Sequence, residues 1–233
     1  MTPQDRLSRA VKEAALGQYE EALDEHIWFH NHALEEEPAL RGVRLSFALA
    51  YWLDLGEKYP PAMAKLLAIR DEKTEKLLNG TTDWHLFNDV MAINETLHDE
   101  AATCLLFKEI RNRSEDFALS CSRVAMPSLL KCGDYSLARI YIPDPHASLD
   151  RMADDLNEGM EWAMEGDNTE HEMKTEAMVQ IYADNVNMLL DAFRKTGDQP
   201  LALDLRLRAL SLIPDESLRR LVDGRLRLII DEV

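Results

Sequence analysis

The sequence has few of the residues that cross-link or interrupt a folded chain. Only three of its 233 residues are cysteine, and glycine and proline number nine each. The cysteines, Cys104, Cys121 and Cys132, form an odd set without a C-x-x-C pair, which predicts buried thiols in a reducing compartment rather than a disulfide framework or a zinc finger. A chain of this length can bury a core large enough to fold without such cross-links.

Long apolar runs are missing too. No segment approaches the roughly 18 consecutive apolar residues of a membrane span. Charged residues interrupt the first 14 positions, where a signal peptide needs an apolar core. We therefore expect a cytoplasmic protein with no membrane partner.

Basic side chains are outnumbered by acidic ones. The chain has 43 Asp and Glu against 26 Lys and Arg, a net charge of −17. This charge repels nucleic-acid phosphates, so we expect no nucleic-acid partner, and it favours basic partners. Residues 194–227 are the exception, with eight basic against five acidic side chains. Such a gradient could favour a self-assembling scaffold or homo-oligomer, but ordinary solvated helix faces explain most of these charges better.

The apolar residues predict an all-α fold. They recur at intervals of three and four rather than two, and no segment favours a strand. Short connections predict antiparallel neighbours. The expected helices cover residues 3–16, 19–36, 40–55, 60–78, 83–95, 99–112, 115–131, 135–141, 148–165, 169–195, 199–212 and 215–230.

Four turns between these helices share a pattern in which a glycine is followed five or six residues later by an alanine. We expect the glycine to end one helix in a left-handed conformation and the alanine to let the next helix approach closely. A degenerate fifth turn runs from Leu97 to Ala101. The four turns run from Gly17 to Ala22, Gly56 to Ala62, Gly133 to Ala138 and Gly197 to Ala202.

These turns resemble those of the tetratricopeptide repeat (TPR) family. The last one fits best, because Ala209 and Pro214 also follow Gly197 and Ala202 as in the family. The resemblance implies a right-handed superhelical stack of antiparallel helix pairs, a TPR-like α-solenoid of about 11–12 helices. We expect a single divergent repeat domain over residues 1–233, with an atypical insertion near 143–170.

The resemblance also implies a non-catalytic scaffold or adaptor that binds a protein or peptide on its concave face, with no cofactor. The family's groove, carried over by offset from each turn glycine, has a basic end suited to an acidic or C-terminal peptide. Ordinary solvent-exposed surface is the alternative for each position. No phosphate-binding glycine loop, G-x-S-x-G or H-E-x-x-H motif is present, so we expect no enzyme. The groove residues are Arg123, Lys131, Asn187, Asp191, Arg194 and Lys195.

Two histidines give an alternative function. His26 and His30 are four residues apart on one expected helix, and Glu25 or Glu37 could complete a metal site. The competing interpretation is that the two aromatic residues between the histidines face the core and leave the imidazoles partly exposed.

An acidic run from Asp154 to Glu176 contains one lysine, Lys174, and interleaved methionine and tryptophan. Docking of a basic amphipathic partner and a plain solvated helix face both fit this run.

Overall fold

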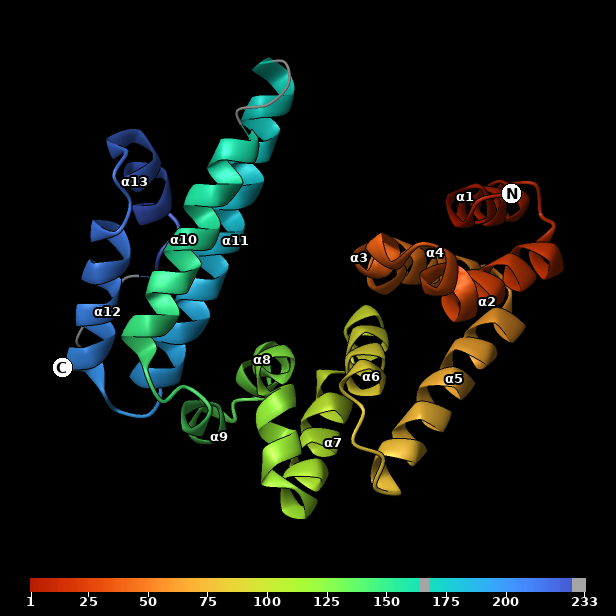
Figure 1. Cartoon of the computed structure of the whole chain (residues 1–233), viewed down its shortest axis with the longest axis horizontal. Helices are drawn as coiled ribbons and strands as arrows, with labels where there is room; N and C mark the ends of the chain where they lie inside the picture. Colours follow the sequence, from red (N-terminus) through yellow and green to blue (C-terminus); the bar gives the residue numbers. More distant parts are fainter. Residues whose placement is uncertain (164–167, 228–233) are drawn as a thin grey trace. The chain divides into compact units, whose positions relative to one another are not determined.

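The protein is all-α over the part of the chain that the structure describes. The structure is a computed structural model and describes residues 1–163 and 168–227, which hold no β-strand. It divides into two compact units, 1–128 and 129–233, called here the N-terminal and the C-terminal unit and described separately (Figure 1). The predicted all-α class is confirmed, and the predicted superhelix over the whole chain stays a prediction.

In the N-terminal unit successive helices pack against one another, α1 on α2, α4 on α5, α5 on α6 and α6 on α7. The boundary between the units falls within α8. The helices are α1 (Pro3–Ala15), α2 (Tyr19–Glu36), the 3-10 helix η1 (Pro38–Leu40), α3 (Arg41–Leu45), α4 (Phe47–Lys58), α5 (Pro60–Leu78), α6 (Trp84–Thr96), α7 (Glu100–Arg113) and α8 (Glu115–Lys131).

In the C-terminal unit the long helix α11 contacts most of the other helices. It packs against α9, α10, α12 and α13, and Figure 1 shows it side by side with α10. The helices are α9 (Tyr135–Ile140), α10 (Pro145–Ala163), α11 (Asn168–Arg194), α12 (Gln199–Ser211) and α13 (Glu216–Asp223).

Most predicted helices match the observed ones within three residues at the ends that the structure describes, but two predictions are wrong. The helix expected over 40–55 is broken at Ser46, whose hydroxyl donates to the carbonyl of Gly42 at 2.8 Å. That carbonyl is the usual helical acceptor for the Ser46 amide, which bonds Val43 instead, so the helix is interrupted. The helix expected over 215–230 ends at Asp223, and residues 224–227 are not helical. Positions 228–230 lie outside the described residues.

The predicted glycine caps are confirmed at three of the four turns. Gly17, Gly133 and Gly197 have φ of +78°, +76° and +85°. In each turn the glycine amide and the next amide bond carbonyls near the helix end, which is the Schellman arrangement. The degenerate turn has the same two bonds with His98 in place of glycine, at a φ of +56°.

The expected cap at Gly56 is wrong. Gly56 lies inside α4, where a Cβ would come within 3.2 Å of the backbone nitrogen of Met63 on α5. Its lack of a side chain therefore permits close packing of two helices rather than a left-handed turn. In the degenerate turn Ala101 is exposed, and the position equivalent to the buried alanines holds the buried Thr103.

Two glycine substitutions test this assignment. Gly17→Ala puts a side chain at positive φ, and we expect a loss of about 1 kcal/mol in the free energy of unfolding. Gly42→Ala in α3 meets nothing within 4 Å and removes a helical glycine, so a gain of up to about 1 kcal/mol is expected. Urea unfolding of both variants measures the difference, and equal effects would contradict the assigned backbone conformations.

The core of the N-terminal unit surrounds Trp52 of α4, whose indole N–H donates to the carbonyl of Ala62 at 2.9 Å. The cysteine prediction is partly wrong, because Cys104 and Cys121 are buried but Cys132 is exposed. Burial raises the pKa of the Cys121 thiol to about 11. Across the two described stretches, no helix has the length and apolar character needed to span a membrane.

Candidate functional site

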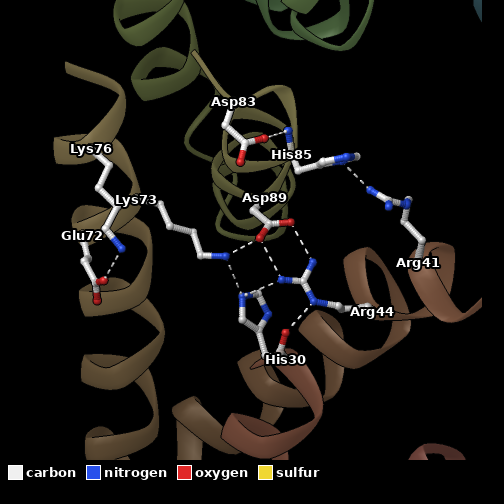
Figure 2. A network of polar contacts seen from close by, with 9 residues as sticks. All are labelled: His30, Arg41, Arg44, Glu72, Lys73, Lys76, Asp83, His85 and Asp89. Atoms are coloured by element: carbon white, nitrogen blue, oxygen red, sulfur yellow. Dashed lines mark hydrogen bonds and ion pairs between the residues drawn. The ribbon is translucent and has the colours of Figure 1, made fainter. Parts of the chain in front are cut away.

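A buried cluster of three ionised side chains and one histidine joins four helices of the N-terminal unit. Figure 2 shows His30 of α2, Arg44 of α3, Lys73 of α5 and Asp89 of α6 pointing toward one another. Arg44 Nη1 and Nη2 each donate to one oxygen of Asp89 at 2.7 Å, and Lys73 Nζ pairs with the same carboxylate. The Nε of Arg44 donates to the backbone carbonyl of His30 at 2.6 Å.

The cations of this cluster stabilise the ionised form of Asp89. Burial by itself would raise the pKa of the carboxyl group. The hydrogen bonds and positive charges of Arg44 and Lys73 outweigh burial and lower the pKa of Asp89 to about 2. The carboxylate is therefore ionised at neutral pH and fully engaged by its two partners.

His30 is neutral in this setting. Burial, followed by the charges of Arg44 and Lys73, lowers the pKa of its imidazole to about 3, although Asp89 acts in the opposite direction. Its Nε2 lies 3.2 Å from Arg44 Nη2 and 3.3 Å from Lys73 Nζ, so this nitrogen accepts from a cation.

His26 lies one helical turn before His30 and is also buried. Its ring stacks on Trp52 with centroids 5.6 Å apart, and neither ring nitrogen has a hydrogen-bond partner. Burial lowers the pKa of His26 to about 4. A neutral polar ring is thus held in an apolar setting without a partner for its N–H group, which is destabilising.

These contacts overturn both sequence-based interpretations of the histidines. The imidazoles are 2% and 3% exposed, so they are not partly exposed flanking groups. The metal site is not formed either, because the imidazole of His30 faces two cations. Glu25 is paired with Arg6 at 3.0 Å and Arg9 at 3.2 Å. Within residues 1–163 and 168–227, no group of three His, Cys, Asp or Glu side chains is arranged to hold a metal ion.

The buried cluster has a structural role: its ion pairs and hydrogen bonds tie α2, α3, α5 and α6 together. Both oxygens of Asp89 are occupied, and Arg44 is 6% exposed. Sequence reasoning missed this cluster. The available signal was the pair Asn88 and Asp89 within an apolar helix, since a buried carboxylate needs a cationic partner.

The predicted groove residues fall into two sets. Arg123 and Lys131 lie on α8, and Lys195 directly follows α11; all three are exposed. Asn187, Asp191 and Arg194 lie on α11, and the structure brings them together around a short piece of the chain itself. That piece, Arg225-Leu226-Arg227, follows α13 and is called here the C-terminal segment.

The C-terminal segment is held through its backbone by one side chain of α11. Asn187 Nδ2 donates to the carbonyl of Arg225 at 3.0 Å, and Asn187 Oδ1 accepts from the amide of Arg227 at 2.8 Å. The two bonds bracket Leu226, which is 5% exposed. On α12, Arg206 Nε lies 3.3 Å from the carbonyl of Arg227.

Both arginines of the segment meet acidic side chains of α11. Arg225 pairs with Glu176 and Arg227 pairs with Asp191, whose other oxygen accepts from Arg194 at 3.0 Å. The face therefore presents carboxylates to basic side chains, whereas the sequence-based groove was expected to present basic groups to an acidic peptide. We call Glu176, Asn187 and Asp191 the α11 clamp.

The acidic run shows a solvated face in the residues that can be described. Asp154, Asp155 and Glu158 of α10 are exposed, as are Glu170 and Glu172 of α11. Glu161 is exposed too, and Glu176 pairs with Arg225 of the C-terminal segment. Two more members of the run, Glu165 and Asp167, lie outside the described residues.

Comparisons with protein-family models, curated proteins and solved structures give no match to this chain. The site must therefore be interpreted from its own geometry.

Proposed function

We propose that this chain is a non-catalytic helical scaffold that binds a peptide segment of a partner protein, and that its helix pairs are divergent TPR-like repeats. The α11 clamp supports the first part, because it already holds a short chain segment by side-chain bonds to the backbone. Because such bonds are made to backbone groups, which all residues share, they can hold an extended segment of almost any sequence. The shared cap at Gly17, His98, Gly133 and Gly197 supports the second part.

The acidic composition adds to the proposal. The net charge of −17 attracts basic segments over a distance of about one Debye length, roughly 8 Å at physiological salt. The clamp then provides a local site where arginine side chains meet carboxylates. Long-range attraction and short-range recognition thus favour the same class of partner.

A photo-crosslinking experiment tests this function. We replace Lys195, an exposed residue just after α11, with p-benzoylphenylalanine and irradiate cells that produce the full chain. A discrete crosslinked partner is expected from position 195. The matched control has the same amino acid at position 105 on α7 of the N-terminal unit, where Leu105 is also exposed. No crosslink at position 195, or the same products from both positions, would contradict binding at this face.

A further inference from the structure

The C-terminal segment has the features of a bound ligand. It lies outside the last helix, it contributes one buried apolar side chain, and both of its arginines pair with acids from another helix. Its backbone is bonded by an amide side chain rather than by other backbone groups of α11. Each of these contacts is one that a separate peptide of the same sequence could make.

The partners of the segment form a stripe on α11. Glu176, Gln180, Asn187 and Asp191 are separated by four, seven and four residues, and this spacing places them along one helix face. Arg194, three residues after Asp191, pairs with Asp191 rather than with the segment. Gln180 Oε1 lies 3.3 Å from Arg225 Nε, next to the Glu176 pair. The stripe is thus continuous along the contacts of the segment.

We propose that the α11 clamp is a binding site for a partner segment with the pattern arginine, apolar residue, arginine, and that the chain's own Arg225-Leu226-Arg227 occupies this site until the partner replaces it. The inference rests on the proposed function and names the chemistry of its ligand. Glu176 and Asp191 select a ligand with two basic side chains, and the buried position of Leu226 between them selects an apolar one.

The nature of the contacts makes replacement feasible. Each ion pair has one solvated member, Glu176 at 59% and Arg227 at 57% exposure, against 24% for Arg225 and 12% for Asp191, so water reaches one side of both pairs. The segment nevertheless competes well while it is attached, because a tethered ligand has an effective concentration on the order of millimolar. A free peptide should therefore bind the unaltered chain poorly and bind tightly once the attached segment is repelled.

The test uses the full chain with Arg225→Glu and Arg227→Glu together, which places like charges opposite Glu176 and Asp191. The probe is a dye-labelled, C-terminally amidated synthetic peptide with the sequence of residues 220–227. We expect its dissociation constant for this variant, measured by fluorescence anisotropy, to be at least about tenfold lower than for the unaltered chain. Arg220→Glu, in which an exposed arginine of α13 loses its pair with Glu216, is the control for charge reversal and should not tighten binding.

Two further variants keep the result interpretable. Adding Asn187→Ala to the opened chain should remove the tightened binding, whereas Asn185→Ala, two residues earlier on the same helix, should leave it. If the double charge reversal disturbs folding by circular dichroism, the single variant Arg227→Ala releases one exposed side chain and should still tighten binding about threefold. The inference would be overturned if the folded double variant bound the peptide no more tightly than the unaltered chain, or if Asn187→Ala left the tightened binding unchanged.

The outcome separates this inference from the proposed function. Loss of peptide binding alone, with crosslinks at position 195 retained, overturns the arginine-apolar-arginine ligand and leaves the binding function standing. Loss of both overturns both.

Discussion

Asp89→Asn is expected to lower the free energy of unfolding of the N-terminal unit by about 3–5 kcal/mol, because it leaves the buried Arg44 without its counter-ion. The substitution keeps the shape of the side chain, so the effect reports the charge rather than a cavity. A loss of this size should lower the melting temperature by about 10 °C or more. Urea unfolding and thermal scans followed by circular dichroism measure both quantities.

Two matched variants identify the cause. Asp71→Asn removes a carboxylate that pairs with Arg70 but is 64% exposed, and we expect a change of at most about 1 kcal/mol. Replacing all three charged members, as in Arg44→Met with Lys73→Met and Asp89→Leu, should recover most of the loss, since an apolar set avoids the burial of unpaired charge. If Asp89→Asn were as mild as Asp71→Asn, the buried cluster would not be the tie described here.

The second large effect is a loss of stability in acid that begins near pH 6.5. The pKa of His26 is lowered from 6.5 to about 4, and that of His30 to about 3. Between these values and 6.5 the unfolded chain binds protons that the folded chain does not, so stability falls as the pH falls. Each histidine contributes about 1.4 kcal/mol per pH unit, and His26 alone accounts for about 3 kcal/mol by pH 4.

Asp89 continues the same trend at lower pH. Its folded pKa of about 2 lies below the ordinary 3.8, so its contribution is complete above pH 3.8 and is lost between 3.8 and 2. The three groups act in one direction, and no compensating gain is expected from them in acid.

His26→Phe tests the histidine contribution. The variant keeps an aromatic ring against Trp52 and removes one titrating group. We expect the slope of stability against pH between about 4.5 and 6 to fall by about 1.4 kcal/mol per unit, with parallel behaviour above pH 7. Urea titrations at a series of pH values give the slope, and an unchanged slope would show that the ring is not buried in the neutral form.

Much of the fold could be predicted from local sequence. The helix ends at Pro60 and Gly133 were predicted correctly, because a missing amide or a left-handed turn acts within a few residues, whereas the end expected at Gly56 was not. Ser46 shows the limit. Its hydroxyl donates to the carbonyl of Gly42, which the Ser46 amide would bond in a continuous helix. Nothing in the apolar periodicity distinguishes it from a serine that continues the helix.

The site depended on contacts that are distant in sequence. Arg44 and Asp89 are 45 residues apart, and Asn187 lies 38 and 40 residues before its two backbone partners. Periodicity places each of these residues on a helix face but does not say which face meets which. The offset from Gly197 did select Asn187 and Asp191, yet it did not predict their contacts with Arg225 and Arg227, because these arginines were assigned to a helix.

Amide hydrogen exchange at Arg227 tests the central claim most directly. In the unaltered chain this amide donates to Asn187 Oδ1, so it should exchange slowly. The peptide of residues 220–227, made with a deuterated backbone, is then added at millimolar concentration. If it displaces the C-terminal segment, the Arg227 amide of the chain should exchange at least about tenfold faster. The amides of α11 and α12 should keep their protection. Unchanged protection of Arg227 with the peptide bound would mean that the two segments do not share a site.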